Sequence, residues 1–327
     1  MSRGTGLAGT TLRGSMRAQM ASQRNRKRLS SLGTALMFLG PALGFYIVFS
    51  IYPLFRNAYL SLHEQELIGN ELTWVWVGLQ NYVTLLTADH VFPRAAGHNL
   101  IWAAAAIVLE TGIAFVLALI LHERVRGTRA FRILWFMPVI LSDVIAAQIW
   151  SWVYHLDYGL VNGILRGIGL DSLVHSWLGD PSTALGALIG ITTWKWTGFN
   201  MVLLLAAMTT ISTDVLDAAK VDGVNRWQNV RHVILPSIQP MIGTAVLLNL
   251  TGKMKLFDLV WVATMGGPAL STETVATYFL RRAFPTSFTA ESKMGYAAAI
   301  ATVWFLIILI ATVVVSRVMR QRLEDVD

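Results

Sequence analysis

The chain alternates long apolar stretches with polar loops, and six of the stretches have the length of a membrane-spanning helix. Such a helix needs roughly 20 consecutive, mostly apolar residues. The first stretch is too long for the apolar core of a signal peptide, and no small-residue cleavage site follows it. The pattern predicts an all-α, polytopic membrane protein with six transmembrane helices, approximately Leu32–Tyr52, Asn99–Leu121, Ile133–Tyr154, Ala184–Met208, Pro240–Thr264 and Tyr296–Ser316.

The basic residues give these helices an orientation. With the N-terminus inside, seventeen Lys and Arg fall in the inner tails and loops, and six fall in the outer loops. Positive residues gather on the cytoplasmic side of membrane proteins. We therefore expect both termini to be cytoplasmic. The predicted parts are a basic cytoplasmic tail over 1–30, a transmembrane permease domain over 31–320 and a short C-terminal tail over 321–327.

Composition narrows the function classes. Of the 327 residues only 14% are charged, whereas a soluble domain has about 25%. The chain has no cysteine, which excludes disulfides and thiolate metal sites. The net charge of +7 is concentrated ahead of the first stretch, around Arg24 and Arg28. No basic face of a folded domain is evident, so we expect no nucleic-acid partner. The histidines are scattered, so we expect no metal site. Nothing in the sequence places serine, histidine and acidic residues together, so we expect no catalytic site.

The inner loop over about 211–236 carries two short helical patterns. Leu216 and Ala219 share a helix face, Gly223 is a helix stop, and Pro236 closes the loop. A short amphipathic helix pair on the cytoplasmic side can dock into a groove of a partner subunit. A helix pair lying along the membrane surface is the alternative.

The string from Asp217 to Pro236 resembles the EAA loop of permease subunits of binding-protein-dependent ABC importers. That loop reads Glu-Ala-Ala, three residues, Gly, nine residues, Ile, any residue, Leu-Pro. Here Asp217 replaces Glu and Val233 replaces Ile, at an intact spacing. The resemblance implies that this loop couples the chain to an ATPase. The coupling residues it implies are Leu216, Asp217, Ala218, Ala219, Asp222, Gly223, Leu235 and Pro236.

Further strings resemble the sugar-permease branch of this family, the branch of the maltose-importer type. They are Val77–Tyr82, Trp177–Leu185, Thr192–Ile211 and Phe257–Phe284, and the resemblance covers about Leu32 to Arg320. It implies a type I ABC importer permease fold in a prokaryotic cell membrane. It also implies a second permease subunit in a heterodimer, two ATP-binding subunits that hold ATP and Mg, and an extracytoplasmic binding protein that delivers a sugar.

The chain itself is not expected to be an enzyme or to hold a cofactor. It carries no Gly-x-x-x-x-Gly-Lys-Ser/Thr phosphate loop, so ATP hydrolysis falls to the partner subunits.

Polar residues inside the apolar stretches suggest where a solute passes. Ionisable groups in a span are costly and usually face the bundle interior. Asn249, Lys253 and Leu256 recur on one face of the fifth stretch. In the resembled maltose-type permeases this face lines the sugar site, together with the preceding span. The expected pathway residues are Trp194, Lys195, Gly198, Asn200, Met201, Asn249, Lys253 and Leu256, with packing or lipid-belt roles for the tryptophans as the alternative.

Other solutes and mechanisms stay open at this point. Lys195 and Lys253 suit the anion of a glycerol-phosphate-type solute, although a disaccharide or oligosaccharide is the first choice. Glu110, Asp143 and Asp258 either form bonds inside the bundle or carry ions in a stand-alone ion-coupled transporter. Transporters of that class usually show related halves, which are not evident here.

A turn is predicted just outside the fifth stretch, at Gly266, Gly267 and Pro268. It is expected to contribute to the docking face for the binding protein, and a purely structural turn is the alternative.

Overall fold

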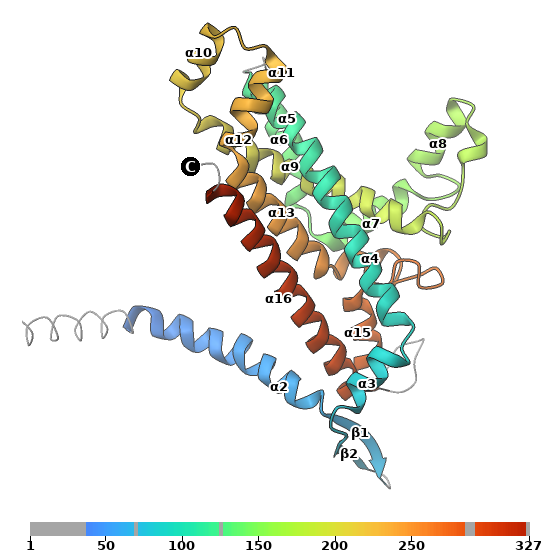
Figure 1. The fold of residues 1–327 in the computed structure, drawn as a ribbon. Coiled ribbons are helices and arrows are strands. Elements are labelled where there is room, and N and C mark those ends of the chain that lie inside the picture. The colour runs from blue at the N-terminus through green and yellow to red at the C-terminus, as the bar shows by residue number, and fades with distance from the viewer. Residues whose placement is uncertain (1–36, 69–70, 124–126, 285–291, 325–327) are drawn as a thin grey trace, which may run out of the picture. The chain divides into compact units, whose positions relative to one another are not determined.

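The computed structural model describes residues 37–68, 71–123, 127–284 and 292–324 (Figure 1). The predicted tail over 1–30, the start of the first apolar stretch and residues 325–327 lie outside this range. By its contacts the chain divides after Tyr59 into two units. In the described part the first unit is an apolar helix that begins at Met37 and includes the π-helical turn η1 (Ile47–Ile51) and all but the last residue of α2 (Tyr52–Leu60).

Among the described residues, three helices are long and apolar enough to cross a membrane: Met37–Leu60, Val91–His122 and Met294–Met319. Three helix pairs pass the same test together but are bent. These are Thr128–Ile140 with Asp143–Val153 at 102°, Ala184–Thr209 with Thr213–Val221 at 75°, and Arg226–Ser237 with Gln239–Met254 at 69°. Counting each bent pair as one span gives six, which agrees with the predicted helical membrane protein.

The second unit is a bundle of tilted helices. Its long elements are α4 (Val91–Ala105), η2 (Ala106–Glu110), α5 (Thr111–His122), α6 (Thr128–Ile140), α9 (Ala184–Thr209), α13 (Gln239–Met254) and α16 (Met294–Glu324). Helix α9 packs against α5 and α6, while α13 packs against α4 and α16. Small residues allow close approach, as expected for helices in membranes. A Cβ atom on Gly198 of α9 would stand 1.8 Å from the carbonyl oxygen of Trp135 on α6.

Short elements lie at the ends of this bundle, and α7 (Asp143–Val153) and α8 (Leu160–Gly167) project from its side (Figure 1). One end carries α10 (Thr213–Val221), α11 (Arg226–Asn229), η4 (Val230–Ile234) and α12 (Leu235–Ser237). This end is cytoplasmic by the predicted orientation, and we call it the inner end. The outer elements are α3 (Gln80–Thr87), α7, α8, η3 (Asp171–Leu173), α14 (Asp258–Ala263) and α15 (Val275–Ala283).

The second apolar helix begins at Val91, eight residues before the expected Asn99, and the structure differs from the expected elements in three further places. A hairpin of β1 (His63–Ile68) and β2 (Glu71–Trp76), with His63 opposite Trp76, interrupts the all-α pattern. The third stretch bends at Ser142, whose hydroxyl accepts the Ile145 N–H at 3.2 Å and caps a new helix, α7. The fifth stretch ends at Met254, ten residues earlier than expected, and α14 follows as a separate helix.

Candidate transport and coupling sites

An ion pair lies inside the bundle between α13 and the end of η2. The Lys253 ammonium is 2.8 Å from a carboxylate oxygen of Glu110, and both side chains are buried. Each of these buried charges requires the other as a partner, because burying an unpaired charge away from water costs a large free energy. Glu110 therefore fixes the position of Lys253 on the face that was predicted to line the pathway.

A second ion pair joins α9 to the start of α7. The Lys195 ammonium contacts the carboxylate of Asp143, the first residue of α7. The ring of Trp196 lies beside both lysines, with its centre 5.2 Å from the Lys195 nitrogen and 5.6 Å from that of Lys253. At these distances each ammonium is attracted to the ring electrons. Asp143 and Glu110 thus hold two lysines next to one aromatic side chain.

Asn249 lies one helical turn from Lys253 and joins three helices. Its amide nitrogen donates to the Thr111 hydroxyl at 3.0 Å, and its oxygen accepts from the Asn200 amide at 3.4 Å. A cavity of about 340 Å³ opens beside these residues. It is lined by Asp143, Trp196, Phe199, Leu248, Asn249, Thr251, Gly252, Lys253, Lys255 and Leu256. Aromatic side chains with a few amide, hydroxyl and charged groups are the usual lining of a small-molecule site.

The predicted pathway residues divide into two sets. Asn249, Lys253 and Leu256 line the cavity, and Lys195 and Asn200 are bonded to residues of its wall. The other three lie in helix packing. Met201 is buried in the core with Ala114 and Ala118, Gly198 contacts α6, and the Trp194 ring packs against Trp150 at 5.5 Å. Asp258, which was expected to form bonds inside the bundle or carry ions, is exposed.

Asn99 on α4 is a functional candidate that sequence reasoning missed. Its amide donates to the Lys253 carbonyl at 2.8 Å, and its oxygen accepts the Val275 N–H at 2.9 Å. This fully buried side chain therefore ties the end of α13 to the first residue of α15. Its local sequence shows only a polar residue at the start of an apolar stretch, so no pattern could reveal its partners.

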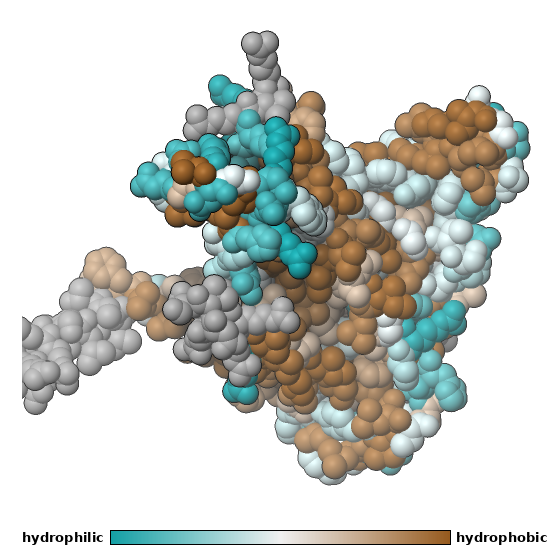
Figure 2. Space-filling model, turned by 45° about the horizontal axis from the view of Figure 1, so that its top comes forward, coloured by the Kyte–Doolittle hydropathy of each residue, from teal (hydrophilic) through white to brown (hydrophobic). Residues whose placement is uncertain are grey.

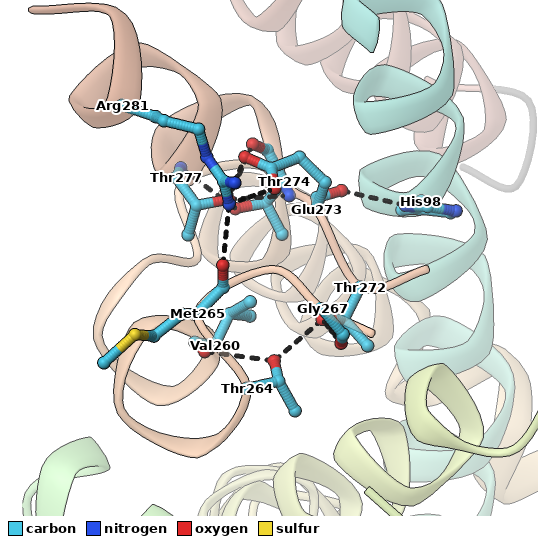
Figure 3. Close-up of polar contacts among 10 residues, drawn as sticks. All are labelled: His98, Val260, Thr264, Met265, Gly267, Thr272, Glu273, Thr274, Thr277 and Arg281. Atoms are coloured by element: carbon cyan, nitrogen blue, oxygen red, sulfur yellow. Dashed lines mark hydrogen bonds and ion pairs between the residues drawn. The ribbon is translucent and has the colours of Figure 1, made fainter. Parts of the chain in front are cut away.

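The predicted turn at Gly266–Pro268 lies in a network of polar contacts at the outer end (Figure 3). The Thr272 hydroxyl donates to the Gly267 carbonyl at 2.7 Å, and the Arg281 guanidinium donates to the Met265 carbonyl at 2.7 Å. Met265, Ala269 and Leu270 have positive φ values of 51°, 49° and 61°. A positive φ strains the backbone of any residue that has a Cβ atom, and residues strained in this way are found most often at functional sites. The turn is thus held in a strained shape by contacts on several sides.

Glu273 is the centre of that network. Its carboxylate accepts from Arg281 at 2.8 Å and from the Thr277 hydroxyl at 3.1 Å, and its carbonyl contacts His98 Nδ1 at 2.8 Å (Figure 3). Burial raises the pKa of this carboxyl, and the Arg281 charge offsets the effect only in part. Gly266 has to be glycine here, because a Cβ atom would stand 2.1 Å from a Glu273 carboxylate oxygen.

A second carboxylate cluster, also missed from the sequence, lies between α3 and α4. Asp89 accepts hydrogen bonds from the hydroxyls of Tyr278 and Tyr296, and from the N–H groups of Val91 at 2.7 Å and Phe92 at 2.9 Å. Burial raises the pKa of the Asp89 carboxyl, but these hydrogen bonds outweigh it and the net shift is downward. The cluster fastens α15 and α16 to the start of α4.

The loop predicted to couple to an ATPase, at the inner end, is a series of short helices with capped ends. The N–H of Val224 donates to the Ala219 carbonyl at 3.1 Å, and the N–H of Gly223 donates to the Lys220 carbonyl at 3.1 Å. With Gly223 at φ +72°, this is the Schellman ending of a helix. Asn225 and Gln228 then form a capping box that begins α11. The loop therefore has a definite shape within the chain.

The predicted coupling residues lie on two faces of this loop. Ala219 is buried and Leu216 packs against the core between α5 and α9, so these two hold the loop in place. Asp217, Ala218, Asp222, Gly223, Leu235 and Pro236 are exposed. Three further apolar side chains of the loop, Val215, Val221 and Trp227, are also exposed.

Comparison with known proteins agrees with this arrangement. Residues 111–324 match the family described as binding-protein-dependent transport system inner membrane component. The probable ABC transporter permease protein YurN of Bacillus subtilis is 34% identical over 275 residues, which cover 84% of this chain and 91% of that protein. The trehalose/maltose transport system permease protein MalF of Thermococcus litoralis is 31% identical over 287 residues, 88% of this chain and 93% of that protein.

A solved structure has the same fold. It is a bacterial ABC transporter involved in the import of the acidic polysaccharide alginate, and its matching chain superposes with a TM-score of 0.76 at 22% identity. The match covers 91% of this chain and 99% of the other. The matched model, the relatives and the fold lead to one conclusion: this chain belongs to the family of inner membrane components of binding-protein-dependent transport systems.

Proposed function

We propose that the chain is a transmembrane permease subunit of an ATP-driven importer for a disaccharide or oligosaccharide. An extracytoplasmic binding protein delivers the sugar, a second permease subunit forms the other half of the path, and two partner subunits bind ATP and Mg. The main support for this proposal is the loop α10–α12. Its short helices have capped ends, and it exposes the apolar side chains of Val221 and Trp227 at the inner end. Apolar side chains in that setting suit a partner groove.

The sugar assignment rests on the cavity beside α13 and on the relatives. Trp196 and Phe199 offer aromatic faces, and Asn249 and Thr251 offer polar groups, around a volume of about 340 Å³. A permease that is 31% identical carries the name of a trehalose/maltose system. Stacking surfaces combined with a few polar groups suit the apolar faces and hydroxyls of a sugar ring.

The structure gives less support to the two alternative solutes or mechanisms. Lys195 and Lys253 are each paired with a carboxylate, so the phosphate of a glycerol-phosphate-type solute would have to displace Asp143 or Glu110. The same pairs leave neither carboxylate as a free ion carrier. Membership of a binding-protein-dependent family is also at odds with a stand-alone ion-coupled transporter.

The outer turn supports delivery by a binding protein. Two of its three non-glycine residues at positive φ are held by hydrogen bonds: the Met265 carbonyl accepts from Arg281 at 2.7 Å, and the Leu270 carbonyl accepts from the Glu273 N–H at 3.4 Å. A loop kept in an unfavourable conformation at the outer end fits a surface whose shape a partner recognises.

The experiment reconstitutes the chain with its second permease, ATPase subunits and binding protein in vesicles. Wild type should show uptake of a labelled disaccharide that depends on both ATP and binding protein. Val221→Asp should lose ATPase co-purification and uptake together, because it places a charge in an apolar contact. The matched control is Val83→Asp, the same change at an exposed valine of α3 at the opposite end of the bundle.

Three results would contradict the proposal. They are uptake that continues without ATP, equal ATPase binding by wild type and Val221→Asp, and loss of ATPase binding in the Val83→Asp control alone. A thermal-shift screen of the binding protein with disaccharides and sugar phosphates tests the solute class separately, since preference for the phosphates would remove the sugar assignment and leave the coupling role untouched.

A further inference from the structure

Helix α8 has an apolar face that no part of the described chain covers. Leu160, Ile164 and Ile168 follow one another at intervals of four residues, the spacing of one helix face. Their exposed fractions are 64%, 55% and 64%. Figure 2 shows apolar surface on the lobe at the upper right, where Figure 1 places α8. Three large aliphatic side chains exposed side by side indicate that something outside this chain, a partner or lipid, covers them.

The opposite side of α8 is fixed to the chain, so the apolar face is turned outward by construction. Asn162 is fully buried, and its amide donates to the carbonyls of His155, Leu156 and His175 at 3.0 to 3.3 Å. Its oxygen accepts from the Trp177 indole N–H at 2.9 Å. This satisfies the whole amide and prevents α8 from rotating about its axis to hide its apolar side.

The charged group of α8 is also turned away from that face. The Arg166 guanidinium donates to the Leu156 carbonyl at 2.9 Å and to the Asp157 carbonyl at 3.0 Å. Within Leu160–Gly167 Arg166 is the only ionisable residue. The exposed face is therefore purely aliphatic.

This face continues the apolar surface of a membrane-spanning segment. Helix α7 is the second helix of a bent pair that together has the length and hydropathy of a span, and its Val144, Ile145 and Trp152 are exposed. Tyr158, also exposed, follows between α7 and α8. Aromatic side chains such as Trp152 and Tyr158 concentrate where lipid meets water, which places α8 at the boundary of the outer leaflet.

We propose that α8 lies on the outer leaflet of the membrane with Leu160, Ile164 and Ile168 in the acyl-chain boundary. Helices of this kind bury their apolar face about 5–10 Å into the headgroup region. A protein partner fits less well, because Leu160, Ile164 and Ile168 include none of the Trp, Tyr or Arg residues that dominate the binding energy of protein interfaces. As an interfacial helix, α8 then anchors the adjacent ends of α7 and α9 at a fixed depth in the membrane.

The chain has no cysteine, so single cysteines can carry a nitroxide label without further changes. Ile164→Cys reports on the face of α8, and Ser172→Cys, an exposed polar position in η3, is the matched control. The labelled chain is assembled with its partner subunits in phosphatidylcholine vesicles. Collision rates with oxygen, which concentrates in lipid, and with a water-soluble nickel chelate are then compared by electron paramagnetic resonance.

The oxygen-to-nickel ratio should be several-fold higher at position 164 than at position 172. A second label at Ile168→Cys should agree with Ile164→Cys, which covers the case that one variant fails to assemble. Nickel access at 164 equal to that at 172 would overturn the proposal by placing α8 in water. Protection of 164 and 168 from both reagents would also overturn it, since a protein partner would then cover the face.

Discussion

Lys253 on α13 points its ammonium at Glu110 on η2, 2.8 Å away, and both side chains are shielded from solvent. The residues come from the second and fifth apolar stretches of the chain. The pair places a fixed cation at the wall of the cavity and leaves no free charge on either residue. The ion pair therefore both stabilises the packing of the helices and sets the charge at the cavity wall.

Replacing Lys253 with Met should destabilise the subunit by about 3–5 kcal/mol, because Glu110 is left buried without its partner. The double variant Glu110→Gln with Lys253→Met should recover most of this loss, since no charge then remains. Thermal unfolding of the purified subunit in detergent measures both. Equal losses in the single and double variants would contradict the ion pair, and Lys255→Met, at an exposed lysine of the same cavity, is the control.

Replacing Asn249 with Ala should reduce sugar uptake while the transporter still assembles. The change removes a polar group from the cavity wall and its hydrogen bonds to Thr111 and Asn200, at a stability cost of about 1 kcal/mol each. Initial uptake rates in vesicles measure the effect. Thr244→Ala is the control, because that hydroxyl lies on the same helix outside the cavity and is bonded to the Pro240 carbonyl at 3.0 Å. Equal uptake rates for wild type and Asn249→Ala would remove Asn249 from the pathway.

Replacing Gly223 with Ala should loosen the end of α10. At φ +72° a Cβ atom costs roughly 1–2 kcal/mol, and Asn tolerates this region better. No atom lies within 4 Å of the added Cβ position, so backbone strain is the cause. Hydrogen exchange over residues 216–230 should be roughly 5- to 30-fold faster in the Ala variant, with Gly223→Asn between it and wild type. Identical exchange in all three proteins would show that this Schellman ending does not limit loop opening.

Hydropathy and charge were sufficient to predict the helical membrane fold, because lipid demands continuous apolar helices. They could not predict the bends. A hydropathy window measures composition and not the direction of the helix axis. The stretch Ile133–Tyr154 was therefore predicted as one helix, although Ser142 caps a second helix inside it. The Ser142-Asp143 pair was the available signal, since Ser commonly caps a helix and Asp is favoured in its first turn.

The candidate site was predicted only as far as one helix face could show it. Asn249, Lys253 and Leu256 share a face by spacing alone, and the structure places all three at the cavity. Their partners Glu110, Thr111 and Asn200 come from other helices, and a contact between helices depends on crossing geometry that no local pattern contains. For Gly198 the structure shows a close contact with Trp135 on α6, which spacing along one helix could not reveal.

The Asp89 cluster gives a pH-dependent prediction. Hydrogen bonds from Tyr278, Tyr296 and two backbone N–H groups lower the pKa of Asp89 below its usual value despite partial burial. A carboxyl with a lowered folded pKa stabilises the protein fully above its unfolded pKa, and this stability is lost as pH falls through the folded pKa. Asp89→Asn should therefore lower stability at pH 7 by about 1.5 kcal/mol, near the low end for bonds to a charged group because the site is partly exposed.

The gap between wild type and Asp89→Asn should stay constant from pH 7 to pH 5 and shrink below about pH 4, where an ordinary aspartate begins to protonate. Thermal midpoints across this range test it, with Asp171→Asn as the control, because Asp171 is exposed and outside the cluster. A gap that widens as pH falls from 7 to 5 would mean that the Asp89 pKa is raised, and so that burial outweighs the hydrogen bonds of the two tyrosines. A gap that persists at pH 3 would mean that the neutral carboxyl bonds to the tyrosines equally well, so that geometry and not charge fastens α15 and α16 to α4.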